Sequence, residues 1–280
     1  MDVGITRKPL GPGSVAWRIG GERRALLAGG YGLLLQVGHP VVGAGVLEHS
    51  NFKAEPWERL DRTMTSLLTT IYGGQAALDE AARLRELHKS IKGVDNRGRR
   101  YHALSQEAYW WVHATLFQGF VDLERHFGVP LGDADQRTLY REWRQLGEVL
   151  GIKADRMPET VEGFREYFDD VVENRLEDNQ SVRDVLHALS MADVGPPHRL
   201  VPSPVWNLVK PLGGSVQRTA TVGLLPVALR ERWGLSWTVT DQNRFDRLAK
   251  AVRVVGPRVP GRIGLYRIAY DAKRRARLAG

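Results

Sequence analysis

The chain has 280 residues, of which 42% are hydrophobic, which is enough to bury a substantial core. It has no cysteine, and this excludes disulfides, thiolate ligation of haem and the covalent attachment of c-type haem. The net charge is +8, yet residues 247–280 carry ten Lys or Arg against one acid, so the basic character belongs to the C-terminal tail.

Residues 1–20 contain prolines and glycines and no apolar core of the signal-peptide type. We therefore expect an N-terminal arm (1–20), a helical domain (21–280) and a cytoplasmic protein. The longest apolar run begins at Ala25 and is too short to span a bilayer, so it predicts a buried helix. Pro40 predicts a break at His39, because proline disfavours helical geometry in the residue before it. The following VVGAGVLEHS is rich in small residues that could pack against a flat cofactor or another helix.

Residues 56–72 read PWERLDRTMTSLLTTIY, with apolar residues at steps of three and four that predict one buried helix face. Pro56 is well tolerated in a first helical turn, and Gly73 favours the helix end. A second stripe beside the apolar one carries Arg59 and Thr63. These two polar residues make the stripe a candidate functional surface.

Residues 75–93 form the next predicted helix, QAALDEAARLRELHKSIKG, in which His88 falls within the apolar stripe. A buried imidazole needs a partner, because an unpaired buried polar group costs about 1–3 kcal/mol. That partner is a carbonyl, a carboxylate or a metal. The commoner role of such a histidine is a core residue satisfied by hydrogen bonding.

A loop or small hairpin is predicted from residue 93 to residue 105, followed by a helix that Ser105 would cap and Gly128 would end. This helix is apolar nearly all round and belongs in the core. It contains His113, the rival candidate for a metal ligand. A carboxylate di-iron site has little support, because neither His88 nor His113 has a Glu three residues earlier.

Further helices are predicted from Asp133 or Asp135, after Pro158, and from Thr240 or Asp241. The proline-rich stretch 193–211 predicts an irregular crossing and a candidate sub-domain boundary. Strand patterns are scarce, so the sequence predicts a mostly α-helical protein. The sequence has no phosphate loop, no serine-nucleophile elbow and no nucleic-acid motif. The basic tail is a solvated helix or a weak contact with an anionic membrane.

The order and spacing of five segments carry a resemblance: LLLQVGHPVVGAGVLEHS, PWERLDRTMTSLLTTIYGG, LHKSIKG, YHALSQEAYWWVHATL and YREWRQLGEVLGI. Together they resemble the MpaB-like or rubber-oxygenase catalytic-domain family, long catalogued as a domain of unknown function. The resemblance implies an all-α single domain, globin-like or an irregular bundle, around a non-covalent haem b pocket.

In the rubber-cleaving members a helix histidine is the proximal iron ligand, and an Arg-x-x-Lys-Thr run borders the distal pocket. The resemblance places His88 at the ligand position, with His113 as runner-up, and Arg59, Arg62 and Thr63 at the distal run. Arg62 stands where those oxygenases carry a lysine that can coordinate iron, and a guanidinium has no lone pair for a metal. The resemblance therefore implies an open or water-filled sixth position and puts the rubber substrate in doubt.

Two function classes follow. The first is a haem-dependent oxygenase that acts with dioxygen on a small apolar organic molecule, with Arg59 and Thr63 orienting bound oxygen or water. The second is a non-catalytic helical protein that binds an apolar ligand or a membrane surface.

Overall fold

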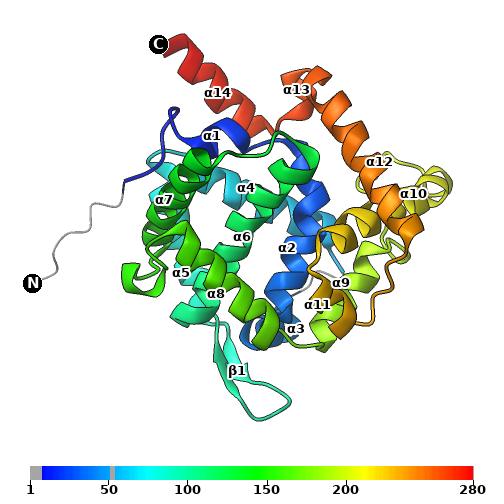
Figure 1. Cartoon of the computed structure of the whole chain (residues 1–280), viewed down its shortest axis with the longest axis horizontal. Helices are drawn as coiled ribbons and strands as arrows, with labels where there is room; N and C mark the ends of the chain where they lie inside the picture. Colours follow the sequence, from blue (N-terminus) through cyan, green and yellow to red (C-terminus); the bar gives the residue numbers. More distant parts are fainter. Residues whose placement is uncertain (1–7, 51–53, 280) are drawn as a thin grey trace, which may run out of the picture.

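A computed structural model describes residues 8–50 and 54–279. The described residues form an all-α domain with one small two-stranded sheet, as the sequence predicts (Figure 1). The first seven α-helices are α1 (Val15–Ile19), α2 (Leu26–Gly38), α3 (Pro40–His49), α4 (Pro56–Tyr72), α5 (Ala76–Lys89), α6 (Gln106–Phe127) and α7 (Asp133–Leu150). The next seven are α8 (Val161–Asn174), α9 (Gln180–Leu189), α10 (Ser203–Leu224), α11 (Val227–Arg232), α12 (Val239–Val255), α13 (Gly261–Gly264) and α14 (Arg267–Ala279).

Three single-turn 3₁₀ helices and a hairpin complete the fold: η1 (Arg23–Ala25), η2 (Ala154–Arg156), η3 (Gly256–Arg258), β1 (Lys92–Val94) and β2 (Arg100–His102). The strands are antiparallel, with Gly93 opposite Tyr101. In Figure 1 the hairpin projects from the end of the molecule opposite to α14.

Helices α2 and α6 lie at the centre, and the other helices surround them (Figure 1). Helix α2 packs against α6, α9 and α10, which explains why its sequence is apolar on most sides. Helix α6 buries Trp110, Trp111 and Phe117 completely or nearly so. The more polar helices α4 and α5 pack against each other and contact the rest of the domain mainly through α7, α14 and α1.

The bounds of α4 agree with the sequence prediction at both ends, since Pro56 opens the helix and Gly73 follows its last residue. The predicted break at His39 is also present: α2 and α3 meet there at an angle of 103°. No single helix in the described part of the chain is long and apolar enough to cross a bilayer. The bent pair 23–38 and 40–49 meets that length and composition requirement only when both parts are counted together.

Residues 15–19, which the sequence assigns to an arm, form helix α1 in the core. The Glu142 carboxylate accepts hydrogen bonds from the backbone N–H groups of Val15 (2.8 Å) and Ala16 (2.9 Å), so a side chain from α7 caps this short helix. The buried Trp17 indole donates to the Ile71 carbonyl at 2.7 Å. Ser14 also caps the helix locally, because its hydroxyl accepts a hydrogen bond from the Trp17 N–H at 3.3 Å. The prediction of an arm was therefore wrong although a local capping residue was present, since the surrounding prolines and glycines favour a loop.

One local prediction is confirmed in part and two are wrong. Ser105 occupies the N-cap position of α6, as predicted, but its side chain makes no capping bond, and its buried hydroxyl has no partner among the described residues. The cap of α12 is Thr238, which forms a reciprocal capping box with Asp241, so this helix begins before the predicted start. Helix α10 begins at Ser203 and contains Pro211, so the irregular crossing ends earlier than predicted.

Candidate functional site

The two helices that carry most candidate residues, α4 and α5, pack against each other after a short turn at Gly73 and Gly74. Ser66 of α4 donates a hydrogen bond to Glu80 of α5, which ties the two helices together near the turn. Arg59 lies toward the other end of α4, and His88 lies in the last turn of α5.

The end of α3 links Arg59 to the neighbourhood of His88. Arg59 donates from Nη1 to the Ser50 hydroxyl, which directly follows α3, at 2.7 Å. One turn earlier, a Cβ on Gly45 would lie 3.4 Å from the side chain of Ile91, three residues after His88. The small residues of α3 that the sequence associates with a flat cofactor thus lie between the two candidate residues.

The hairpin contacts the end of α3 through the side chain of Tyr101. Its hydroxyl donates to Glu48 at 2.5 Å and contacts His49 Nε2 at 3.1 Å. Burial and the Glu48 carboxylate raise the pKa of Tyr101 to about 12, so the phenol stays protonated near neutrality. Sequence reasoning assigned no role to Glu48 or Tyr101, because no local pattern joins residues that are 53 positions apart.

His88 is half-buried, whereas the sequence pattern predicts a core position. Its Nδ1 lies 2.6 Å from the Leu84 carbonyl one turn earlier, and the edge of its ring faces Tyr109 of α6 with centroids 5.8 Å apart. A carbonyl only accepts, so Nδ1 carries the proton of the neutral ring and Nε2 keeps its lone pair. Within the described residues Nε2 has no hydrogen-bond partner.

Metal-binding histidines commonly show this arrangement, because the carbonyl fixes the tautomer and the orientation of the ring. His88 therefore fits the requirement for a single axial ligand of haem iron. Among residues 8–50 and 54–279 there is no cluster of three or more metal-ligating side chains. A haem held by one histidine and by packing does not require such a cluster.

Arg59 is a half-buried cation. Burial is the main cause that lowers the pKa of its guanidinium, and the nearby charge of Arg62 is the second cause. Arginine nevertheless remains charged at neutral pH. Within the described ranges it forms no ion pair with a carboxylate. Its charge is thus available for an anionic group such as a haem propionate, or for a polarised oxygen.

The two other candidates on α4 lie next to Arg59 but are more exposed. Arg62 is 63% exposed and makes only long ion pairs, at 3.5 Å to Glu58 and 3.8 Å to Glu55. The exposed Thr63 uses its hydroxyl to donate to the Arg59 carbonyl at 2.8 Å. Of the three candidates on α4, only Arg59 is half-buried.

His113 lies in the core between α6 and α7. Its Nε2 donates to the Trp143 carbonyl at 2.7 Å, and the Trp143 indole donates back to the His113 carbonyl at 2.8 Å. The two rings stack with centroids 5.1 Å apart. Burial lowers the pKa of His113 to about 4, so the ring is neutral at physiological pH. A ring nitrogen that already donates in a packed core is a poor candidate for iron.

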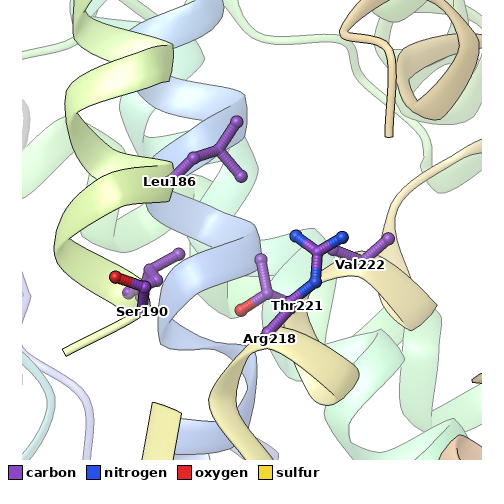
Figure 2. A pocket seen from close by; sticks show the side chains of 6 residues that line it. Leu186, Ser190, Arg218, Thr221 and Val222 are labelled. Carbon is purple, nitrogen blue, oxygen red and sulfur yellow. The ribbon is translucent and has the colours of Figure 1, made fainter. Parts of the chain in front are cut away.

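Neither of two cavities in the described part of the chain is lined by His88 or Arg59. The first, of about 40 Å³, lies between α9 and α10 and is lined by Leu186, Ser190, Arg218, Thr221 and Val222 (Figure 2). It is large enough for a few water molecules at most. The second, of about 270 Å³, lies between α3, the hairpin and α9, where paired charges such as Arg99 and Glu177, 2.7 Å apart, make it polar.

Comparison with known proteins assigns the class. Residues 17–254 match the family described as "ER-bound oxygenase mpaB/B'/Rubber oxygenase, catalytic domain", which covers most of the chain. Two similar relatives are "Uncharacterized protein Mb2261" of Mycobacterium bovis and "Uncharacterized protein Rv2237" of Mycobacterium tuberculosis. Each is 28% identical over 254 residues, covering 88% of this chain and 95% of the relative. No solved structure matches the chain.

The fold and the family together define an all-α oxygenase catalytic domain. The chain belongs to the MpaB and rubber-oxygenase family.

Proposed function

We propose that this protein is a haem b-dependent oxygenase that acts with dioxygen on a small apolar organic molecule. The observation that carries the proposal is the hydrogen bonding of His88: a carbonyl of its own helix fixes Nδ1, and Nε2 has no partner among the described residues. Membership of an oxygenase family supplies the reaction class.

Haem b would supply the iron at which dioxygen is activated. The chain would contribute the lone pair of His88 Nε2, with the Leu84 carbonyl holding the ring in one tautomer. Arg59 would contribute a fixed positive charge toward a propionate or a polarised oxygen, with Ser50 positioning the guanidinium.

The remaining assignments have smaller roles in this proposal. Thr63 would contribute its hydroxyl next to Arg59, where it now donates to the Arg59 backbone carbonyl. Arg62 supplies no ligand, and its exposed side chain is consistent with an open or water-filled sixth position. His113 would maintain the contact between α6 and α7. We assign the protein to the cytoplasm, with peripheral contact to the membrane.

Absorbance of the purified protein, as isolated and after titration with haemin, tests the proposal. We expect a Soret band that saturates at one haem per chain. A protein that stays colourless and does not bind haemin would favour the alternative, a non-catalytic helical protein that binds an apolar ligand.

A further inference from the structure

The N-terminal half of α10 carries an exposed apolar surface that the proposed reaction does not use. Its side chains define what we call the α10 face: Leu200, Val205, Leu208, Val209 and Leu212. Leu208 is 81% exposed and Leu212 is 71% exposed. The four helical members lie at steps of three and four and so share one side of α10. A continuous apolar surface of this kind marks an interaction site.

The opposite side of α10 is anchored, so this orientation of the helix is fixed. The Trp206 indole donates to the Val194 carbonyl at 2.7 Å, and Lys210 donates to the Ala192 carbonyl at 2.7 Å. A Cβ on Gly213 would lie 3.2 Å from the sulfur of Met191. The α10 face consequently points away from the protein, and α10 lies at the right-hand edge of the molecule in Figure 1.

The segment that carries the α10 face is basic. No Asp or Glu occurs between Val194 and Arg230, whereas this segment carries the exposed Arg199 and Arg218 together with Lys210. The preceding acid, Asp193, is exposed but pairs with His187. A helix face that combines large apolar side chains with neighbouring cations complements the acyl chains and headgroups of an anionic membrane.

The C-terminal helix α14 differs from α10 because its apolar side is buried. Helix α14 buries Ala269 and Ala272 against the core and packs on α4, so its apolar side is already covered. Leu278 is its one large apolar residue that is strongly exposed in the part of the chain that the structure describes. Helix α14 can therefore add charge to a membrane contact, but α10 offers more apolar surface for insertion.

We propose that the α10 face docks on the surface of an anionic lipid bilayer. The loop at residues 194–195 joins this face to the candidate site: the Trp57 indole, two residues before Arg59, donates to the Gly195 carbonyl at 2.8 Å. The rings of Trp57 and Trp206 meet edge to face, with centroids 5.8 Å apart. If the proposed function holds, docking brings the start of α4 close to the bilayer, where an apolar substrate dissolves.

Co-sedimentation of the full chain with lipid vesicles tests this proposal, with and without haem. The wild type is expected to sediment with vesicles of phosphatidylcholine and phosphatidylglycerol, and less so at high salt. The double variant Leu208→Asp and Leu212→Asp should lower the affinity by at least about tenfold, because two inserted side chains become charged. Val129→Asp is the matched control, since Val129 is 78% exposed but lies before α7, away from the α10 face.

A second pair of variants compares the charges near the α10 face with the charges of α14. Arg199→Glu with Arg218→Glu should weaken binding to vesicles that contain phosphatidylglycerol, whereas Arg274→Glu with Arg275→Glu in α14 should weaken it less. Circular dichroism verifies that each variant is folded.

Three outcomes would overturn the proposal: a wild type that does not sediment with vesicles, a double variant that binds as well as the wild type, or a concentration-dependent dimer that the double variant abolishes. The last outcome would make the α10 face an interface between two copies of the chain. Because sedimentation does not depend on haem, a protein that binds vesicles without binding haem contradicts only the proposed oxygenase function.

Discussion

His88 and His113 lie on neighbouring helices of one domain, and their surroundings differ in the property that decides metal binding. His88 has one ring nitrogen bonded to its own helix and the other free, and its ring is half-buried. His113 is fully enclosed and exchanges two hydrogen bonds with Trp143 across the contact between α6 and α7. Burial alone therefore does not distinguish the two candidates, whereas the availability of a ring nitrogen does.

The largest expected effect is on haem binding. His88→Ala removes the free Nε2, and we expect its affinity for haemin to fall by more than about a hundredfold, since loss of a ligand should exceed the effect of losing a neighbouring partner. His113→Gln should bind haemin like the wild type. Titrations followed at the Soret band measure both, and a normal titration of His88→Ala with a defective His113→Gln would exchange the two roles.

The second effect is on stability, and here we expect the variant at His113 to lose more than the variant at His88. His113→Ala leaves a cavity beside Trp143 and an unpaired carbonyl, so the free energy of unfolding should fall by about 3 kcal/mol. His88→Ala, at a half-buried position, should change it by about 1 kcal/mol or less. Chemical denaturation of the two apo-proteins makes this comparison, and equal losses would show that the contact between α6 and α7 does not depend on His113.

The third effect is on the pH dependence of stability. The pKa of His113 is lowered to about 4 in the folded protein from an ordinary value of 6.5, because burial disfavours the charged ring. Between these two values the unfolded chain binds the additional proton, so stability is full above pH 6.5 and declines as the pH falls toward 4. The shift corresponds to a loss of about 3 kcal/mol.

Denaturation curves at neutral pH and near pH 4.5, for the wild type and His113→Gln, isolate this contribution. The difference between the two proteins should shrink as the pH falls. Because His88→Ala keeps His113, it should retain the dependence of the wild type, and a His113→Gln variant that also retains it would locate the titration elsewhere.

The sequence predicts most of the fold because its signals are local. Pro56 and Gly73 mark the ends of α4, and Pro40 marks the bend after α2. The errors have different causes. Glu142 supports α1 from another helix, in addition to the local cap at Ser14, and α10 continues through Pro211 although proline disfavours a helix interior.

In the candidate site, too, the sequence predicts what depends on local residues and misses what depends on contacts between distant segments. Helical periodicity placed His88 and Arg59 on helix faces. The hydrogen-bond partner of His88, the Leu84 carbonyl, lies one turn earlier in the same helix. The reciprocal bonds between His113 and Trp143, and the contact of Arg59 with Ser50, depend on packing between segments that no sequence period relates. Periodicity also placed Arg59 and Thr63 on one helix face, but it did not distinguish the half-buried Arg59 from the exposed Thr63.

The fourth effect concerns the half-buried charge of Arg59. Arg59→Met removes a half-buried cation, so the ferric protein should bind cyanide about threefold to tenfold more weakly, in the range of one charge-assisted hydrogen bond. Arg62→Met is the matched control on the same helix and should bind cyanide like the wild type. Optical titration measures both affinities, and an equal loss in the two variants would indicate only a general effect of charge.

The smallest effect is expected for Arg62→Lys. In the related rubber oxygenases a lysine at the matching position can coordinate iron, but the Arg62 side chain is 63% exposed and pairs with Glu55 and Glu58. We expect an unchanged electron paramagnetic resonance spectrum, with an open or water-filled sixth site in both proteins. A new low-spin signal in Arg62→Lys would place this residue within reach of the iron.

Rescue of His88→Gly by imidazole tests the ligand assignment most directly, because free imidazole can replace the missing ring without altering the helix. We predict that His88→Gly binds little haemin by itself and regains the Soret band of the wild type when imidazole is added. Wild-type haem binding by His88→Gly in the absence of imidazole would contradict the assignment of His88 as the iron ligand.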